Sequence, residues 1–530
     1  MVKNIFIIGY KIMKRIFNKL LIINTLIIVF INLSCYQNTK IDYQKNKFLL
    51  LDDRLIKNFK NAKLVVGTVK KNKANPLFVE NKPWEKRFDN LYGNIIYNED
   101  ENLYQCWYSP FIVDYSANNM TLVERQQPYD SPSDREMGIC YAYSKDGINW
   151  VKPELGLVEF EGTKNNNLIG RGPHGTGIFR DLRENDPLKR YKAIFQQFGK
   201  DTKTVHHLKA KNNVQKKLKR TGTGISQDLK EIDPWLDQTL NLDRGISIST
   251  SEDGVNWSKA KRIKGVDVAG DTHNNAFWAP TIGKYVGITR SWHRKGEKRI
   301  WRQVARIESD DFLNWTKEEV ILEGENINDQ MYAMPVFYYA GVYIGLPAIY
   351  SSESDRTWTE LAWSVDTKNW KRISPGLPLI PTSDKVLDYD YGCVYACATP
   401  IFLKNEIRLY YGGSDYLHFG WRNGSLCLAT LRPDGFAGYE QIRKDQTAKV
   451  KTTLMSFDAD SILITADISD NGWIKVNIFD KNGEQIATSD KIVKTITDGL
   501  LRFQKNINSD DIQLEFEFNK AKLYSFAFSN

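Results

Sequence analysis

The chain has 530 residues, which is enough for a core of several hundred residues and an accessory domain. Aromatic residues make up 12% of it, which excludes a disordered class and suits an all-β protein that handles sugars or peptides. The formal net charge of +9 is modest for this length and no basic face with a fold to present it is evident, so nucleic acid is not an expected partner, whereas an anionic polysaccharide stays open.

Residues 1–35 are predicted to be a signal peptide of the lipoprotein type. Basic residues between 14 and 19 precede an apolar run that ends at Leu33. Leu33-Ser34-Cys35 resembles a bacterial lipobox, in which the cysteine is lipidated, although Asn32 stands where an aliphatic residue is usual. We expect export and a membrane anchor at Cys35, in the periplasm or on the cell surface. A plain secretory signal and an uncleaved anchor helix are the alternatives.

Four copies of the pattern Ser-x-Asp-x-x-Asn-Trp organise the middle of the chain. Each copy follows an apolar, alternating stretch of the kind that forms a half-buried strand. The Asp lies where a tight turn begins and can accept hydrogen bonds from backbone N–H groups, while the Trp packs back over the hairpin. The copies begin at Ser144, Ser251, Ser309 and Ser364, and a degenerate fifth is Arg432-Pro433-Asp434-Gly435-Phe436.

The spacing of these copies predicts an all-β fold, a five-bladed β-propeller followed by a small C-terminal β-sandwich. Successive copies begin 107, 58 and 55 residues apart, which matches four-stranded blades with one large insertion. We place a tether at residues 36–47 and the propeller at residues 48–440. Strictly alternating stretches then predict the sandwich at residues 445–530.

Charge and cysteine patterns bear on other ligands. Residues 200–220 hold eight Lys or Arg, which indicates a solvated loop or, alternatively, a contact with an acidic polymer. Five of the six cysteines fall within or beside predicted strands, where a free thiol acts as a small hydrophobic group. Cys393-x-x-x-Cys397 has no companion pair at zinc spacing, so neither a metal site nor a cofactor is expected. We expect a monomer.

Carboxylates stand where the innermost strand of each predicted blade begins. Asp is depleted in strands, and several carboxylates at one mouth of a central channel would repel one another and raise some of their pKa values. Such an arrangement is costly to a fold and useful to acid–base chemistry. The alternative is that these residues cap turns. The residues are Asp89, Asp181, Asp271, Asp329, and Asp388 with Asp390.

The chain resembles the five-bladed propeller glycoside hydrolases of the family 32 and 43 superfamily, which includes invertase-, arabinanase- and levansucrase-like enzymes. The blade count, the Ser-x-Asp-Gly-x-x-Trp turns, Phe179-Arg180-Asp181 and Tyr410-Tyr411-Gly412-Gly413 carry the resemblance. It covers about residues 50–440. Known members place three acids at the channel mouth: a nucleophile or base from the first blade, a transition-state stabiliser from the second and an acid from the third.

The resemblance implies three catalytic residues, Asp89, Asp181 and Asp271. Arg180-Asp181 is the best match, although Leu182 replaces the usual Pro. Asp89 precedes an Asn, whereas the invertase motif has the Asn first. The Glu-Cys pair of invertase-type enzymes is absent, so Asp271 takes the acid's place by position and Glu360 is the reserve.

Further side chains are expected to bind substrate around these acids. Arg180 would keep the neighbouring Asp181 charged, which suits stabilisation of an oxocarbenium-like transition state. Aromatic rings could stack on sugars and histidines could line the mouth, with blade packing and structural roles as the alternatives. The expected residues are Arg180, His273, Asn274, Trp278, Asp329, Tyr332, Asp390, Tyr395 and His418.

Three functions stay open at this point. The first is a glycoside hydrolase acting on an extracellular poly- or oligosaccharide, which needs two carboxyl groups with pKa values pushed apart. The second is a non-catalytic carbohydrate-binding surface lipoprotein, favoured by the missing Glu-Cys pair and by any carboxylates held in buried ion pairs. The third is a sialidase-like or protein-interaction propeller. Fold analogy alone does not decide among them.

Overall fold

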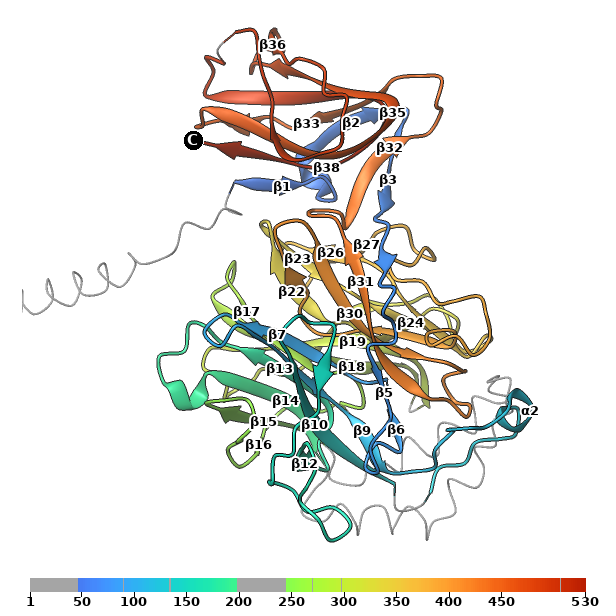
Figure 1. The fold of residues 1–530 in the computed structure, drawn as a ribbon. Helices are drawn as coiled ribbons and strands as arrows, with labels where there is room; N and C mark the ends of the chain where they lie inside the picture. Colours follow the sequence, from blue (N-terminus) through green and yellow to red (C-terminus); the bar gives the residue numbers. More distant parts are fainter. Residues whose placement is uncertain are drawn as a thin grey trace, which may run out of the picture. The chain divides into compact units, whose positions relative to one another are not determined.

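The computed structural model describes residues 46–88, 90–132, 135–197, 245–268, 270–296, 298–505 and 507–530 (Figure 1). Strands dominate these ranges, and the helices in them are α2 (Leu122–Arg125) and two 3-10 turns, η1 (Asp53–Leu55) and η2 (Pro187–Lys189). This confirms the all-β class. None of the helices in the described ranges is long and apolar enough to cross a membrane.

Three sheets have four antiparallel strands each, in sequence order from one edge to the other. The second sheet contains β13 (His174–Arg180), β14 (Tyr191–Gln197), β15 (Gly245–Ser251) and β16 (Lys261–Arg262). The third contains β17 (Asn275–Ala279), β18 (Lys284–Lys295), β19 (Lys298–Ser309) and β20 (Glu319–Glu323). The fourth contains β22 (Val336–Tyr339), β23 (Val342–Gly345), β26 (Ala362–Ser364) and β27 (Trp370–Arg372).

Two larger sheets complete this set. The first sheet has seven strands: β6 (Arg87–Phe88), β7 (Asn94–Asn98), β8 (Leu103–Tyr108), β9 (Pro110–Val113), β10 (Glu136–Ser144), β11 (Trp150–Val151) and β12 (Leu168–Arg171). The fifth has nine: β4 (Lys70–Lys71), β5 (Phe78–Val79), β21 (Gln330–Ala333), β24 (Ala348–Ser351), β25 (Arg356–Thr359), β28 (Cys393–Ala396), β29 (Ile401–Phe402), β30 (Ile407–Ser414) and β31 (Gly424–Leu431). Because β4 and β5 pair with β31, chain from before the first sheet completes the fifth.

The first strands of neighbouring sheets lie side by side, and asparagines join them. Asn94 of β7 donates to the carbonyl of Thr176 at 2.8 Å and accepts from the N–H of Ile178 at 2.9 Å, both in β13. Asn275 of β17 accepts from the N–H of Val336 in β22 at 3.1 Å. A parallel bridge between Asn94 and Ala398 links the first sheet with the fifth. These contacts join β7 with β13, β17 with β22, and the first sheet with the fifth.

The repeated Ser-x-Asp turns have the expected capping geometry. In the third sheet, Asp311 Oδ1 accepts from the N–H groups of Leu313 and Asn314, each at 2.8 Å. Asn314 Nδ2 donates to Asp311 Oδ2 at 2.8 Å, and Ser309 Oγ donates to Oδ1 at 3.1 Å. The same set of bonds recurs around Asp146, Asp253 and Asp366. This confirms the prediction that each Asp caps its turn.

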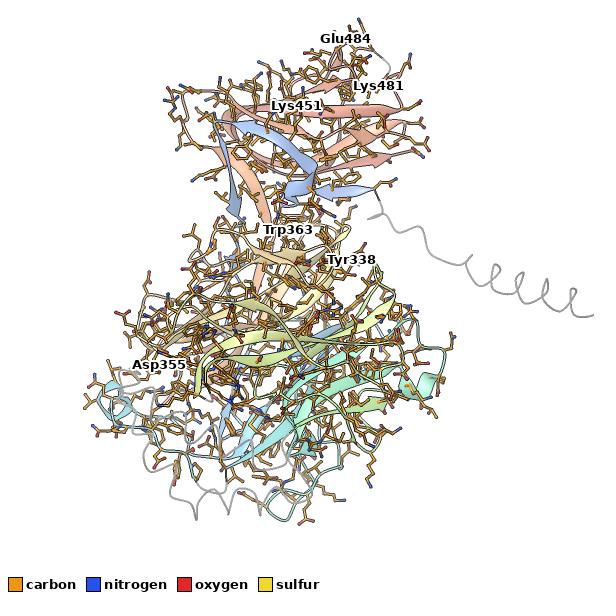
Figure 2. All side chains as sticks on the ribbon, turned by 180° about the vertical axis from the view of Figure 1, so that it is seen from behind. Tyr338, Asp355, Trp363, Lys451, Lys481 and Glu484 are labelled. Atoms are coloured by element: carbon orange, nitrogen blue, oxygen red, sulfur yellow. The ribbon has the colours of Figure 1, made fainter. Side chains whose placement is uncertain are left out.

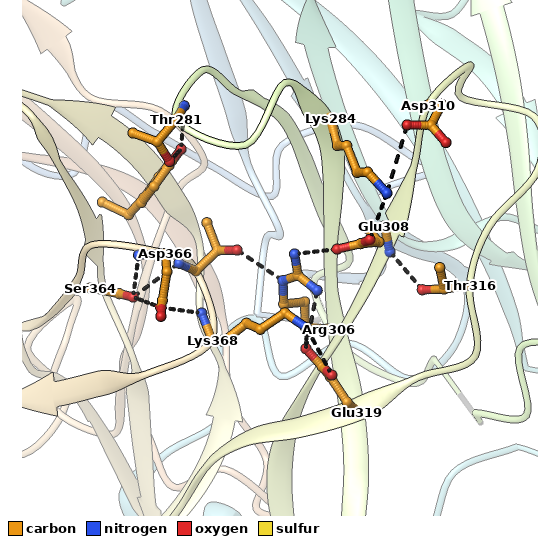
Figure 3. A network of polar contacts seen from close by, with 12 residues as sticks. Thr281, Lys284, Arg306, Glu308, Asp310, Thr316, Glu319, Ser364, Asp366 and Lys368 are labelled. Atoms are coloured by element: carbon orange, nitrogen blue, oxygen red, sulfur yellow. Dashed lines mark hydrogen bonds and ion pairs between the residues drawn. The ribbon is translucent and has the colours of Figure 1, made fainter.

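A buried arginine connects the turns of neighbouring sheets (Figure 3). Arg306 of β19 donates from Nε to Thr367 Oγ1 at 2.8 Å, and Thr367 belongs to the turn of the fourth sheet. Its other nitrogens pair with Glu308 at 2.6 Å and Glu319 at 3.1 Å. Each charge in this network has a partner, so the network stabilises the junction between two sheets rather than forming an open site.

The C-terminal sheet has ten strands, among them β35 (Ser461–Phe479) and β38 (Asp511–Ser529), which pair along most of their length. It differs from the expected domain at residues 445–530, because β1 (Lys47–Leu49), β2 (Ile56–Lys60) and β3 (Ala62–Val66) pair with its strands (Figure 1). Apolar packing explains this, since Phe48 stacks on Phe526 with ring centroids 5.0 Å apart. The other strands are β32 (Ala437–Gln441), β33 (Ala448–Thr452), β34 (Met455–Ser456), β36 (Gln485–Thr488) and β37 (Ile496–Leu500).

Candidate functional site

Six buried rings meet where the first strands begin, and we call them the ring cluster. His174 opens β13 of the second sheet, and Tyr332 and Tyr395 belong to β21 and β28 of the fifth, while the other members lie in loops next to strands. The centroids of Tyr92 and His174 are 5.7 Å apart, and those of Tyr92 and His273 are 5.5 Å apart. Those of Tyr332 and His418 are 4.9 Å apart. The ring cluster consists of Tyr92, His174, His273, Tyr332, Tyr395 and His418, which are all buried.

Asn90 ties the two halves of the ring cluster together. Its Nδ2 donates to the hydroxyl of Tyr92 at 2.9 Å and to that of Tyr332 at 3.4 Å, while its Oδ1 accepts from Arg422 at 3.0 Å. Asn90, Leu91 and Tyr92 have φ angles of +57°, +61° and +44°. This left-handed conformation costs an ordinary residue roughly 1–2 kcal/mol. Strain of this kind persists where the surroundings enforce it, and it gathers at functional sites.

Asp271 brings a carboxylate to the ring cluster. It lies just before β17, and its side chain keeps 26% of its exposure. Oδ1 lies 3.3 Å from Nδ1 of His174, and Oδ2 lies 3.9 Å from Nη1 of Arg290. A partly exposed carboxylate between an imidazole and a guanidinium can exchange a proton with a bound ligand or accept hydrogen bonds from it.

His273 and Asn274 support the segment that carries Asp271. His273 Nε2 lies 3.1 Å from Asn94 Oδ1, and burial lowers the pKa of His273 to about 3 even though a hydrogen bond with the backbone of Thr176 raises it. Its imidazole is therefore neutral at pH 7. Asn274 Nδ2 donates to the carbonyls of Gly175 and Gly270, and its Oδ1 accepts from Thr289 at 2.7 Å. Both side chains contact neighbouring strand starts, and their role in substrate binding stays a prediction.

Asp181, Arg180 and Trp278 lie at the opposite end of the first strands. The structure begins β13 at His174, so Asp181 follows its end instead of opening it. Asp181 Oδ2 accepts from the hydroxyl of Tyr285 at 2.5 Å and lies 3.3 Å from Lys192 Nζ. Arg180 donates to Asn98 at the end of β7 and pairs with Asp100. Trp278 pairs with Tyr285 across β17 and β18 and lies under the guanidinium of Arg183. These three residues do not join the ring cluster.

The other predicted acids are engaged in ion pairs. Asp329 and Glu360 share Arg372, at 2.8 Å and 2.7 Å. Asp390 lies 2.6 Å from Lys71 Nζ and accepts from the hydroxyl of Tyr411 at 2.8 Å. Glu360 and Asp390 are buried. Asp89 and Cys35 lie outside the described residues, as do residues 200–220.

One further acid fixes the loop that carries His418. Asp355, labelled in Figure 2, is fully buried. It accepts from the hydroxyl of Tyr350 at 2.8 Å and from the N–H of Phe419 at 2.7 Å. The backbone N–H of His418 donates to the backbone carbonyl of Asp355 at 2.9 Å. Asp355 thus positions His418, whose Nδ1 lies 3.0 Å from the hydroxyl of Tyr395.

Sequence reasoning missed a group of arginines around Trp292. The ring centroid of Trp292 lies 5.9 Å from the guanidinium carbon of Arg290, 5.8 Å from that of Arg299 and 5.1 Å from that of Arg302. All four residues lie on the hairpin of β18 and β19, whose strands have 12 residues each. Arg290 and Arg299 are buried there, which the charged sequence of the hairpin does not indicate.

The ring cluster and its neighbours offer imidazoles, tyrosine hydroxyls, the guanidinium of Arg290 and the carboxylate of Asp271. Within the described ranges no three His, Cys, Asp or Glu side chains lie where they could hold a metal ion together. The five cysteines of those ranges are buried free thiols. Burial raises the pKa of Cys397, which suits a packing role and not a nucleophile.

Comparison with known proteins gives distant matches only. No protein-family model matches the chain, and no curated protein matches it. A glycosyl hydrolase from Bacteroides ovatus aligns with a TM-score of 0.41 and 13% identity over 69% of this chain and 94% of its own. An N-acetylgalactosamine deacetylase from F. plautii, in complex with blood group B trisaccharide, aligns at 0.40 and 11% over 70% and 96%. A structure from the GH130 family of mannoside phosphorylases, which contains glycoside hydrolases for β-1,2-mannosidic linkages, aligns at 0.40 and 13% over 69% and 94%. These likenesses are too distant to assign an activity to this chain.

Proposed function

We propose that the first to fifth sheets are the blades of a five-bladed β-propeller, that the C-terminal sheet folds as a sandwich, and that the propeller carries a glycoside hydrolase site at the ring cluster. The contacts of β7 with β13, of β13 with β17 and of β17 with β22, together with the bridge from Asn94 to Ala398 of the fifth sheet, support the blade arrangement. In such a fold the starts of the first strands meet at one end of a central channel.

The single observation that carries the activity is the position of Asp271. It is a partly exposed carboxylate beside His174 and Arg290, at the edge of a group of buried aromatic rings. Sugars bind through aromatic faces and directed hydrogen bonds, and hydrolysis of a glycosidic bond needs an acid and a second carboxylate. We assign Asp271 to the acid–base role and Asp89 to the second carboxylate, because Asp89 is bonded directly to Asn90 at the centre of the ring cluster.

Asp271→Asn is the direct test of this proposal. The amide keeps the shape and removes the ionisable group, so turnover should fall on the order of a hundredfold or more while the protein stays folded at the assay temperature, although Arg290 loses its carboxylate neighbour. The parent is first screened against algal and plant polysaccharides to find a hydrolysed substrate. Near-parental turnover by Asp271→Asn on that substrate would remove the residue from the mechanism.

A carbohydrate-binding protein without turnover is the second candidate. It is favoured by the ion pairs that occupy Asp181, Asp329, Glu360 and Asp390, all buried except Asp329, since a paired, buried carboxylate is poorly available as an acid or nucleophile. Saturable binding of a polysaccharide that the parent never cleaves, retained in both Asp271→Asn and Asp89→Asn, would select this function over hydrolysis.

We also propose that the protein is exported and anchored through lipidated Cys35, and that it acts there as a monomer. The apolar run before Leu33-Ser34-Cys35 is the supporting feature. Cys35→Ala should move the protein from the membrane fraction to the soluble fraction and leave the folded domain unchanged. Retention of Cys35→Ala in the membrane with its N-terminal segment uncleaved would favour an anchor helix instead.

A further inference from the structure

The hairpin of β18 and β19 creates an excess of positive charge next to Asp271. Arg290 is buried, and its Nη2 donates to the carbonyl of Tyr332 at 2.9 Å. Its carboxylate neighbour is Asp271, at 3.9 Å. Arg302 donates from Nη1 to the side chain of Gln330 at 2.7 Å and forms no ion pair with a carboxylate of the described residues. Two guanidiniums therefore share one carboxylate, which is not at hydrogen-bonding distance from either of them.

A pocket opens beside these arginines. Its lining combines aromatic, polar and cationic side chains with one aliphatic side chain, Ile300, and this mixture suits a ligand group that carries a negative charge. The Nε atoms of Arg290 and Arg302 are both buried and have no hydrogen-bond partner. The residues that line it include Trp292, Arg302, Gln330, Tyr350, Ser352 and Phe419.

The electrostatics of the arginine group call for an anion. Burial and the nearby positive charge of Arg290 both lower the pKa of Arg302 from its ordinary value. A buried cation without a counter-charge is unfavourable, and the cost is relieved when an anion binds. Guanidinium groups favour planar or tetrahedral oxyanions, because their parallel N–H groups match two oxygen atoms.

We propose that this pocket is an oxyanion subsite and that the saccharide recognised at the ring cluster is acidic, with a carboxylate or a sulfate ester held by Arg302, which lines the pocket, and with the buried Arg290 adding positive charge. This inference deepens the proposed function and rests on it for the position of the sugar. Phe419 is partly exposed and supplies a face on which the sugar ring stacks, and Arg290, at 3.9 Å from Asp271, links the arginine group to the reacting carboxylate.

The test uses small probes that need no knowledge of the natural sugar. Inorganic sulfate, D-glucuronate and D-glucose are titrated into the full chain, and intrinsic tryptophan fluorescence and the melting temperature are followed. Sulfate or glucuronate should bind saturably and glucose should not. Arg302→Gln should weaken that binding at least tenfold. Arg302→Lys keeps the charge but loses the paired N–H groups of the guanidinium, so its affinity should lie between those of the parent and of Arg302→Gln.

Arg183→Gln is the matched control, because it too removes a guanidinium that lies over a tryptophan ring. The guanidinium of Arg183 lies 3.3 Å from the ring centroid of Trp278, at the opposite end of the first strands. It should leave anion binding unchanged. The relative affinities of sulfate and glucuronate distinguish a sulfated sugar from a uronic acid. Equal loss in Arg183→Gln and Arg302→Gln, or no saturable binding of either anion by the parent, overturns the proposal.

Asp271→Asn separates this inference from the proposed hydrolysis. It removes the carboxylate that competes for Arg290, so anion affinity should stay the same or rise while turnover is lost. If the protein binds anions but hydrolyses no saccharide, the oxyanion subsite is supported and the hydrolase proposal is wrong. If it hydrolyses uncharged saccharides and binds no anion, the hydrolase proposal is supported and the oxyanion subsite is wrong.

Discussion

Asp181 and Asp271 show that the surroundings of a carboxylate decide what it can do. Both are acids near the first strand of a sheet, yet Asp181 is buried between the Tyr285 hydroxyl and the Lys192 ammonium, and Asp271 keeps part of its surface. The contacts with Tyr285 and Lys192 engage the buried carboxylate of Asp181, so it is less open to a bound ligand than Asp271 is. The sequence predicts where acids occur along the chain, but not which end of a strand they occupy.

The first residue-scale prediction concerns Asp181→Asn. The amide cannot neutralise Lys192, which keeps only Glu184 at 2.9 Å as a counter-charge. The free energy of unfolding should fall by about 1–3 kcal/mol, measured by urea denaturation, while saccharide binding stays unchanged. Asp100→Asn is the control, because Asp100 also pairs with a basic side chain, that of Arg180, but is itself 72% exposed, and pairs with an exposed partner contribute little. A loss of turnover without a loss of stability would return Asp181 to the site.

The second residue-scale prediction concerns pH and His273. Its folded-state pKa of about 3 lies below the value of about 6.5 in the unfolded chain. The unfolded state therefore binds more protons between these values, and stability is lost as pH falls below about 6.5, by up to about 1.4 kcal/mol per pH unit. Urea midpoints from pH 7 to 4.5 should fall less steeply in His273→Gln. His293→Gln, at an exposed position, should follow the parent.

At the scale of elements, the repeated turn is the part of the fold that the sequence predicts best. Its Ser, Asp, Asn and Trp act within seven residues, so local spacing determines their hydrogen bonds. The strained run Asn90-Leu91-Tyr92 could not be predicted, because Leu and Tyr disfavour positive φ and only contacts with distant residues enforce it. The arginines of β18 and β19 were missed for a related reason: a charged residue in a strand ordinarily indicates a solvent-facing position, and here tertiary packing buries it.

The element-scale prediction tests one turn. Hydrogen bonds from the backbone N–H groups of Asn314 and Leu313 lower the pKa of Asp311 to about 2, although burial opposes this. Asp311→Ala leaves two N–H groups without an acceptor and should cost about 1–2 kcal/mol in the free energy of unfolding. Asp311→Asn keeps an acceptor oxygen and should cost less. Because the folded pKa is lowered, the parent's advantage over Asp311→Asn should be present above pH 4 and fade as pH falls towards 2.

At the scale of the whole described chain from Lys47 to Asn530, one carboxylate joins three separate segments. Asp434, in the degenerate fifth repeat, does not cap its own turn as the other four do. It is fully buried and accepts from Lys47 of β1 at 3.0 Å, from Ser525 of β38 at 2.6 Å and from the hydroxyl of Tyr339 in β22. The departure of this copy from the repeat pattern thus has a structural reason, which the sequence could not reveal, because its partners lie far away along the chain.

Asp434→Ala should therefore weaken the coupling between the fourth sheet and the C-terminal sheet. It leaves the Lys47 ammonium, the Tyr339 hydroxyl and the Ser525 hydroxyl short of an acceptor, and removal of one partner from a buried charged network costs on the order of 3–5 kcal/mol. Calorimetry should show a lowered midpoint and a transition that separates into two, one for each set of sheets. Asp498→Asn is the control, because Asp498 also pairs with Lys47, at 2.8 Å, but has a side chain that is 43% exposed. An Asp434→Ala protein that unfolds in one transition at the parental midpoint would show that the two sets of sheets are held together by their shared strands and apolar packing alone.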